Sequence, residues 1–201
     1  MTIETVDQLR EHYAQPSGRA KDKALRKLEE HSINFIAKSP FMIMSTIDKE
    51  GNMDSSPRGG KEGFIKVIDE KTIAIPDAKG NNRLDSITNI VESGRIATLF
   101  FIPGMDETLR INGKAMISID PAHLAIFEGE KNPIKACILV TVEEMFLHCA
   151  KSIMRAGIWN PETYMDRKEM PTMGRMLNDQ LKIEGEVETQ AAMVERYKKD
   201  L

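Results

Sequence analysis

The most regular pattern in the chain is an alternation of apolar and polar side chains over residues 108–119. Its apolar positions are Leu109, Ile111, Gly113, Ala115, Ile117 and Ile119. A period of two over a dozen residues predicts a β-strand with one buried face. Shorter apolar runs bounded by turn residues predict further strands at residues 41–47, 63–68, 72–75, 95–102 and 136–146.

Helical patterns occupy both ends of the chain and one central segment. In residues 1–38, Thr5 and Gln8 have the spacing of a capping box, and Ser39-Pro40 ends a second helix. That second helix is expected to carry Leu25, Leu28, Phe35 and Ile36. Residues 83–93 predict a central helix with Gly94 as its C-terminal cap.

The remaining helices are expected near the C-terminus. A short helix is predicted over residues 121–127, and a mostly helical tail follows Trp159. The apolar stripe of that tail is formed by Met173, Met176, Leu177 and Leu181.

Six or seven strands joined mainly by short turns predict an antiparallel barrel. Parallel strands need crossovers of a dozen or more residues, and the predicted strands lie too close together for these. We therefore expect one mainly β domain with flanking helices over residues 1–201. Its parts would be N-terminal helices over 1–38, a barrel over 39–147 and a helical C-terminal tail over 148–201.

Composition narrows the class of protein. The 201 residues include 28 Lys and Arg against 31 Asp and Glu, so the net charge of −3 argues against a nucleic-acid binder. No apolar run approaches the length of a membrane span, and the N-terminus lacks a signal-peptide pattern, so a cytoplasmic location is expected. Cys137 and Cys149 lack metal-ligand spacing, no HExxH is present, and no metal site is predicted.

Polar residues that a barrel core does not need gather in four segments. They are residues 55–60, residues 76–83, the polar face of the strand at 108–112, and residues 148–159. The second segment is the most informative, because Gly80, Asn81 and Asn82 directly precede a predicted helix. Free backbone N–H groups and the positive end of a helix dipole favour an anion, above all a phosphate, at such a place.

Two arginines are placed to join such an anion site. Arg83 follows the asparagines, and Arg58 lies in a loop flanked by Gly59, where backbone can approach a ligand closely. The alternative is a capped helix with arginines on the surface. Residue types alone leave both interpretations open.

The order of these segments resembles a known family. The chain carries SSPRGG, TIAIPD, GNNRLDSITNI, RIATLFFIPG and ETLRINGKAMIS in sequence. Over roughly residues 33–147 this resembles the pyridoxamine 5'-phosphate oxidase-like superfamily of FMN-binding split barrels. The most specific segments, PDAKGNNRLDSITNIV and LRINGKAMIS, together with HCAKSIMRAGIW resemble members of a branch described only as FMN-dependent enzymes.

The resemblance implies a set of cofactor-binding residues for FMN. Arg58 and Arg83 would bind the FMN phosphate, helped by Asn81 and Asn82. Pro76 and Asp77 would line the ribityl chain or the ring edge through their backbone, and Gly59 would allow close approach. Thr108 matches the family position near the isoalloxazine ring, with Arg110 next on the same strand face.

The resemblance also implies a homodimer with flavin at the interface. Lys151 and Trp159 would then reach the flavin of the partner chain. Trp159 has an equal alternative, which is to anchor the C-terminal tail. His148 and Cys149 are neighbours on a strand and face opposite ways, so we expect a capping histidine and a packed cysteine rather than a catalytic pair.

The leading functional hypothesis is an FMN-dependent oxidoreductase with an unknown small-molecule substrate and no assigned catalytic residue. The C-terminal EGEVETQAAMVERYKKDL lacks the Arg-, His- and Trp-rich segment of true pyridoxamine phosphate oxidases, which argues against a B6 vitamer. Alternatives are a non-catalytic flavin carrier or sensor, and a related barrel that uses deazaflavin or haem. An RNA-binding barrel is disfavoured by the negative charge and the 5% aromatic content.

Overall fold

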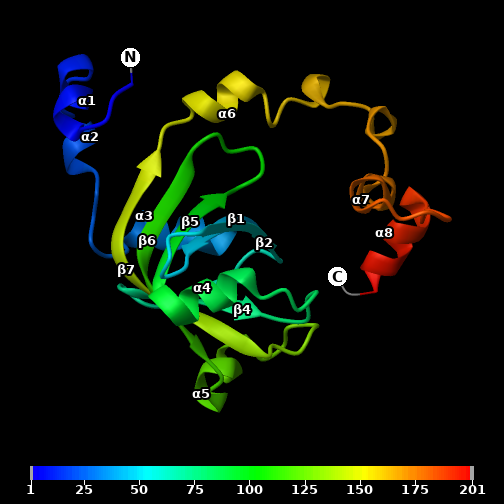
Figure 1. The fold of residues 1–201 in the computed structure, drawn as a ribbon. Helices are drawn as coiled ribbons and strands as arrows, with labels where there is room; N and C mark the ends of the chain where they lie inside the picture. The colour runs from blue at the N-terminus through cyan, green and yellow to red at the C-terminus, as the bar shows by residue number, and fades with distance from the viewer. Residues whose placement is uncertain (1, 200–201) are drawn as a thin grey trace.

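A single antiparallel sheet forms the centre of the computed structural model, which describes residues 2–199. The sheet has the strand order β2-β1-β5-β6-β7-β4-β3 (Figure 1). The strands are β1 (Phe41–Ile47), β2 (Met53–Gly59), β3 (Lys66–Asp69), β4 (Thr72–Asp77), β5 (Arg95–Phe101), β6 (Thr108–Ser118) and β7 (Ala136–His148). All paired strands are antiparallel, and β2 and β3 remain as edges, so the prediction of a split antiparallel barrel is confirmed.

The longest hairpin, β6 with β7, joins the two halves of the sheet. β7 pairs with β6 along its whole length and with β4 along its first half. A register shift between Asn112 and Gly113 bends the hairpin. Gly113 is required there, because a Cβ atom would lie 2.0 Å from the carbonyl oxygen of Thr141. The strand predicted at residues 108–119 is confirmed as β6, and the extra residue of the bulge is Glu143 of β7, which periodicity does not indicate.

The inner face of the sheet carries the hydrophobic core. Its fully buried side chains include Met42, Met44, Phe100, Leu109, Ile111, Ile138 and Val140. Because side chains alternate across a strand, Arg110 and Asn112 lie on the outer face. The same rule places Arg58, which is paired with Met42, on the inner face.

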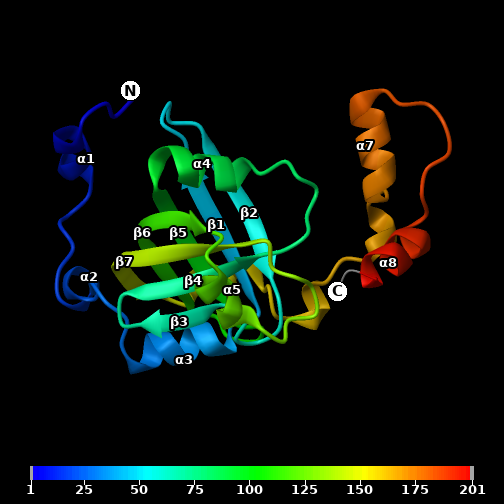
Figure 2. The same cartoon turned by 90° about the horizontal axis from the view of Figure 1, so that it is seen from below.

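Two helices pack against the sheet. α3 (Glu30–Lys38) packs beside β3 and places Phe35 and Ile36 in the core (Figure 2). α4 (Asp85–Ser93) lies against β1 and β2 and contributes the buried Ile90. Gly94 caps α4 with a φ of 65°, as predicted.

The N-terminal helices differ from the prediction. α1 (Val6–His12) has the expected Thr5–Gln8 capping box, and α2 (Arg19–Asp22) is a single short turn of helix. The continuous second helix through Leu25 is wrong. Leu25 instead exchanges two backbone hydrogen bonds with Met145 of β7, and Glu29 caps a helix that begins only at Glu30. Pairing with a strand edge outweighs the local helical preference.

Three boundaries between residues 55 and 85 also differ. The segment around Arg58 is strand, not loop, because it pairs with β1 along its length. Pro57 is tolerated there because β2 is an edge strand. The strand expected at 63–68 begins only at Lys66, and the central helix begins at Asp85, after a left-handed Leu84.

The remaining elements follow β6 and β7. They are α5 (Pro121–Leu124), η1 (Ala125–Phe127), α6 (Lys151–Ala156), η2 (Pro161–Thr163), η3 (Arg167–Glu169), α7 (Met173–Leu181) and α8 (Gln190–Lys198). Figures 1 and 2 show α7 and α8 standing apart from the barrel. Within residues 2–199, none of the helices combines the length and apolar character that a membrane span requires.

The close approach of Gly113 to the backbone of Thr141 can be tested by substitution. Gly113→Ala should lower the free energy of unfolding by about 3 kcal/mol or more, because the methyl group would overlap backbone that belongs to the paired strand. Gly59→Ala is the matched control, since its Cβ would meet only an ordinary contact at 3.6 Å. Urea denaturation measures both. Equal stabilities of the two variants would contradict the close approach.

Candidate functional site

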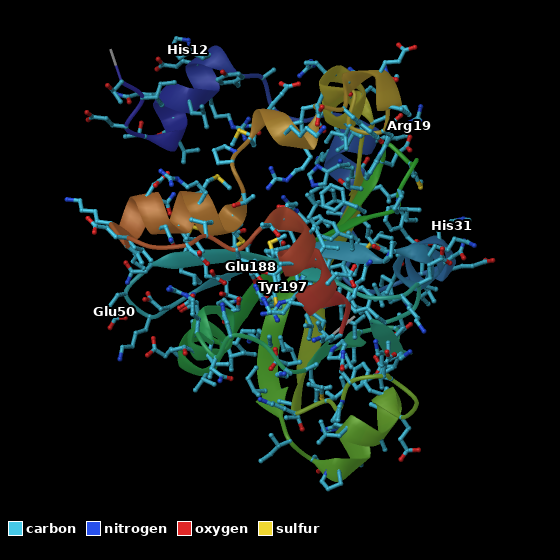
Figure 3. The ribbon with its side chains drawn as sticks, turned by 90° about the vertical axis from the view of Figure 1, so that its right-hand side faces the viewer. His12, Arg19, His31, Glu50, Glu188 and Tyr197 are labelled. Carbon is cyan, nitrogen blue, oxygen red and sulfur yellow. The ribbon has the colours of Figure 1, made fainter. Side chains whose placement is uncertain are left out.

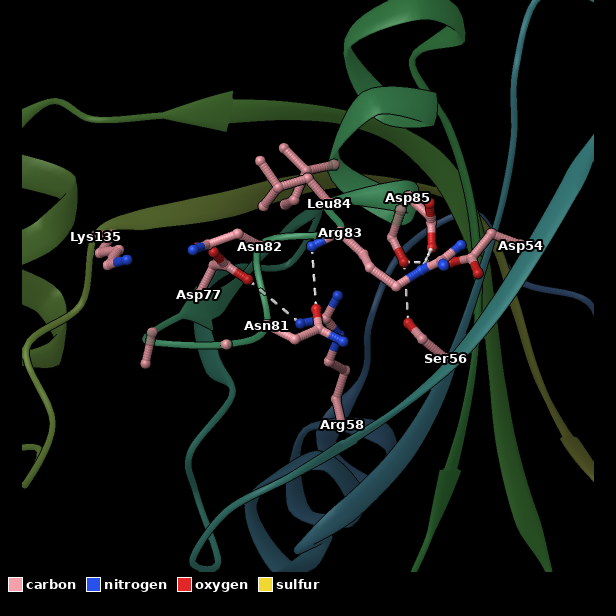
Figure 4. Close-up of a pocket in the computed structure, with 14 residues that line it drawn as sticks. Asp54, Ser56, Arg58, Asp77, Asn81, Asn82, Arg83, Leu84, Asp85 and Lys135 are labelled. Carbon is pink, nitrogen blue, oxygen red and sulfur yellow. Dashed lines mark hydrogen bonds and ion pairs between the residues drawn. The ribbon is translucent and has the colours of Figure 1, made fainter. Parts of the chain in front are cut away.

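The described part of the chain has a pocket of about 210 Å³ between β2, β4 and the start of α4 (Figure 4). Its walls come from segments that are far apart in sequence. They include Asp54, Ser56, Arg58, Asp77, Ala78, Gly80, Asn81, Asn82, Arg83, Leu84, Asp85, Ser86, Ile87 and Lys135. Five of the residues proposed from sequence therefore meet here: Arg58, Asp77, Asn81, Asn82 and Arg83.

Arg58 is the central cation of the pocket. It projects from the inner face of β2, and its side chain is 26% exposed. Its Nη1 donates to Asp77 Oδ1 at 3.3 Å, which bridges β2 to β4 across the open side of the sheet. Its Nε is buried and has no hydrogen-bond partner among residues 2–199. A buried N–H without an acceptor is costly, so this group is poised to bind an acceptor supplied by a ligand.

Arg83 lies at the rim of the pocket, and its side chain points away from Arg58. In Figure 4 its side chain extends toward Asp54 and Asp85, whereas Arg58 extends toward Asp77. Arg83 Nε is 2.8 Å from Asp85 Oδ2, and the side chain is 74% exposed. The hydrogen bond that Arg83 donates to Asp85, together with the negative charge of that carboxylate, raises the pKa of Arg83. The two guanidinium groups thus share a pocket but do not converge on one point.

The loop between β4 and α4 has a strained backbone. Asn82 and Leu84 have φ values of 61° and 60°, which place two non-glycine residues in the left-handed region around Arg83. The Asn81 side-chain oxygen accepts the backbone N–H of Arg83 at 3.1 Å. A Cβ at Gly80 would meet nothing within 4 Å among residues 2–199, so the loop is open on that side. Strain of this kind is typical of ligand-binding loops.

The pocket contains polar residues that the sequence interpretation missed. The buried Ser86 hydroxyl donates to Asp54, and Ser56 and Ser86 share a hydrogen bond of 2.9 Å. The period-two sequence Asp54, Ser56, Arg58 is the available signal, because it places three polar side chains on one strand face. Lys135 has no such signal, since only the pairing of β7 with β4 brings it beside Asp77.

The other proposed residues do not reach this pocket in one chain. Thr108 and Arg110 lie on the outer face of β6, and Thr108 pairs with His148 at the far end of β7. The pocket lies at the opposite end of β7, whose first residues pair with Pro76 and Asp77. Thr108 itself is buried.

Arg110 is held in a polar cluster on that outer face. Its Nη2 is 2.7 Å from Glu144 Oε1, and its guanidinium lies 4.0 Å from the centre of the Phe146 ring. Asn112 also donates to Glu144, at 3.3 Å. Arg110 Nε and Asn112 Oδ1 are buried without a partner in the described chain. One donor and one acceptor on the same sheet face thus remain unsatisfied among residues 2–199.

The segment after β7 begins at the end of the sheet where Thr108 pairs with His148. The Trp159 indole N–H donates to the Met105 carbonyl at 2.9 Å, which anchors the C-terminal tail to the turn before β6. Lys151 begins α6 and is exposed, and Gly59 is exposed at the end of β2. Cys149 is exposed, because the strand ends one residue earlier at His148. The expectation of a packed cysteine is therefore wrong.

The pKa of His148 depends on the charges of the outer-face cluster. Burial, Arg110 and Lys23 lower its pKa below the ordinary value of 6.5. Because the folded state resists protonation, the stability contributed by His148 is complete above 6.5 and is lost as the pH falls through the lowered pKa.

A substitution of Arg110 tests this electrostatic coupling. Arg110→Gln should raise the His148 pKa toward 6.5, because a nearby positive charge is removed, and NMR titration of the imidazole follows the change. Arg95→Gln, which changes an exposed arginine on β5, is the control and should leave the His148 pKa unchanged. A His148 pKa unaffected by Arg110→Gln would remove Arg110 as a cause.

Several solved structures are similar to the chain. Among curated proteins, none is significantly similar. A variant of HupZ from Group A Streptococcus has a similar structure with a TM-score of 0.50 and 19% identity, covering 60% of this chain and 98% of HupZ. A candidate pyridoxamine 5'-phosphate oxidase of Lactobacillus delbrueckii has a TM-score of 0.49 and 19% identity, covering 62% of this chain and 98% of that one. An FMN-binding protein of Syntrophomonas wolfei has a TM-score of 0.43 and 13% identity, with coverages of 58% and 81%.

The family is assigned by sequence rather than by these likenesses. The family model described as pyridoxamine 5'-phosphate oxidase matches residues 28–149. The match spans the whole sheet and includes both polar clusters. It extends over more than half of the chain, and the chain therefore belongs to the pyridoxamine 5'-phosphate oxidase family.

Proposed function

We propose that this protein is an FMN-dependent oxidoreductase that acts as a cytoplasmic homodimer on a small molecule. The observation that carries the proposal is the buried Arg58 Nε, which lacks an acceptor among the described residues and lies in a pocket bounded by the Gly80–Arg83 loop. Membership of the family supports flavin as the ligand.

The residues present fit the phosphate end of FMN. Arg58 would donate to a phosphate oxygen, which satisfies its unpaired N–H. Gly80 leaves room for backbone to approach, and Asn81 and Asn82 add amide donors at the rim. Lys135 supplies a further positive charge from the opposite wall.

The size of the pocket limits what it encloses. A drug-sized ligand needs a cavity of at least about 300 Å³, whereas this pocket has about 210 Å³. The pocket therefore suits the phosphate and part of the ribityl chain, and the ring system must lie outside it.

A second chain supplies the surface for the ring in this proposal. Arg110 and Asn112 have unsatisfied groups within residues 2–199, on the outer face of the sheet. Thr108, Lys151 and Trp159 lie at that same end of the sheet. Contact between the outer face of one copy and the pocket of another would unite the two groups of residues.

FMN supplies hydride and electron transfer when bound, and the protein binds, orients and shields it. Purified protein should be yellow, with the visible spectrum of a flavin. A colourless protein that takes up no FMN would disprove the proposal. Bound FMN that no pyridine nucleotide or other reductant reduces would instead favour the carrier or sensor alternative.

Arg58 provides the residue-level prediction. Arg58→Gln should weaken FMN binding by about 10- to 100-fold, because a charge-assisted hydrogen bond to phosphate is lost. Riboflavin, which has no phosphate, should bind nearly as before. Arg95→Gln is the matched control, since it removes an arginine that pairs with Glu143 and does not line the pocket. Fluorescence quenching titrations measure all affinities. Equal losses for FMN and riboflavin would contradict the phosphate assignment.

A further inference from the structure

The chain exposes far more surface than a folded monomer of its mass. Its accessible surface is 14197 Å². A compact monomer of 22.7 kDa is expected to expose about 9,500 Å². The excess of roughly 4,700 Å² per chain is larger than the share of about 1,000–2,500 Å² that each partner of an obligate homodimer buries. Both terminal segments contribute, because α1, α2, α7 and α8, all inside the described range, contain no buried residue.

The C-terminal arm, defined as residues 160–199, is nevertheless well ordered internally. Thr172 and Thr189 cap α7 and α8. Arg167 joins the two helices, because it donates to the Pro171 carbonyl and to the Gln190 side chain. Arg196 forms two hydrogen bonds with Glu188. The arm is thus a preformed unit, which lowers the entropic cost of docking it elsewhere.

A braced connection holds the arm away from its own barrel. Trp159 is fixed to the Met105 carbonyl, and the Thr163 hydroxyl bonds the carbonyls of Gly157 and Asn160. In Figure 3, α8 with Glu188 and Tyr197 crosses in front of the barrel, and Figures 1 and 2 show that the arm is separated from it.

The arm presents an apolar stripe to the outside. Met173, Leu177 and Leu181 follow one another at helical spacing on α7 and are 48%, 42% and 64% exposed. Arg175 and Asp179 form an ion pair on the opposite face of the helix. This separation of apolar and charged sides is typical of a helix that packs against another surface.

We propose that the C-terminal arm is exchanged between two copies of this chain, with the stripe of α7 packed against the barrel of the other copy. The second copy would lie between an arm and the barrel to which that arm belongs. Two observations favour a copy of this chain over a different protein. The excess area per chain is more than a homodimer needs. The chain also leaves β7 toward α6 beside the outer face of the sheet, where Arg110 and Asn112 each have a polar atom without a partner in the described chain. In a twofold dimer each arm contact occurs twice.

The proposal rests on the homodimer in the proposed function and is independent of the flavin. A colourless dimer with exchanged arms would disprove FMN binding and leave the arm proposal standing. A yellow protein that remains monomeric would disprove the exchange of arms and leave FMN binding standing. Flavin content and oligomeric state are therefore measured on the same full-length samples.

The test compares Leu177→Glu with Ala192→Glu in the full chain. Each adds one negative charge to the arm, but Ala192 is an exposed residue in the third position of α8, where glutamate completes a capping box. Sedimentation equilibrium should show that Leu177→Glu weakens dimerisation by roughly 100-fold or more, since two apolar contacts per dimer are lost. Ala192→Glu should dimerise as the unchanged protein does. Circular dichroism checks that both variants keep their helices.

Hydrogen exchange separates exchange between copies from closure within one copy. The amides of α7 should be protected in the dimer and lose protection on dilution below its dissociation constant. Protection of α7 that is independent of concentration would mean that the arm closes on its own barrel, and would overturn the proposal. A Leu177→Glu dimer as tight as the unchanged dimer would overturn it as well.

Discussion

The pocket depends on the ion pair between Arg58 and Asp77. β2 is an edge strand and β4 belongs to the other half of the sheet, so no backbone ladder joins them. Their side chains meet at 3.3 Å and are only 26% and 17% exposed. Both side chains are partly buried, so each charge is compensated by the other and only partly by water. The contact therefore sets the distance between the two walls while leaving the split side of the barrel open to a ligand.

The same ion pair determines how the pocket selects an anion. Three carboxylates, Asp54, Asp77 and Asp85, balance the three cationic side chains, Arg58, Arg83 and Lys135, so net charge does not attract a ligand. Affinity must instead come from directed donors, and the Nε of Arg58, unpaired among the described residues, is the best placed of these. Asp77 competes with any bound anion for Arg58. A ligand that offers several acceptor oxygens is favoured over one that offers a single negative charge.

Local patterns in the sequence predict the elements whose partners are nearby, and the errors occur where distant strands decide the conformation. The alternation at residues 108–119, the Thr5–Gln8 capping box and the Gly94 cap all have local causes, and each is confirmed. Leu25 leaves the expected helix because Met145 offers backbone partners, and the segment around Arg58 becomes a strand because β1 pairs with it. The candidate site divides in the same way. Glycine and asparagine before the start of a helix favour anion binding, and this property identifies the loop at residues 80–83. The relevance of Ser86 and Lys135, in contrast, depends on which strands become neighbours, and the direction of Arg83 follows from the competing carboxylate of Asp85.

The division of polar residues between two faces has a physical consequence for the whole molecule. Arg58 faces inward and Arg110 faces outward, so one sheet cannot bring them to the same ligand. Arg110 and Asn112 each have a buried polar atom without a partner in the described chain, whereas most buried polar groups in proteins are hydrogen-bonded. Exposed apolar side chains on α7 and the large accessible surface point in the same direction. The exposed apolar side chains of α7 would be covered if the folded unit contained a second chain, as the proposed exchange of arms requires.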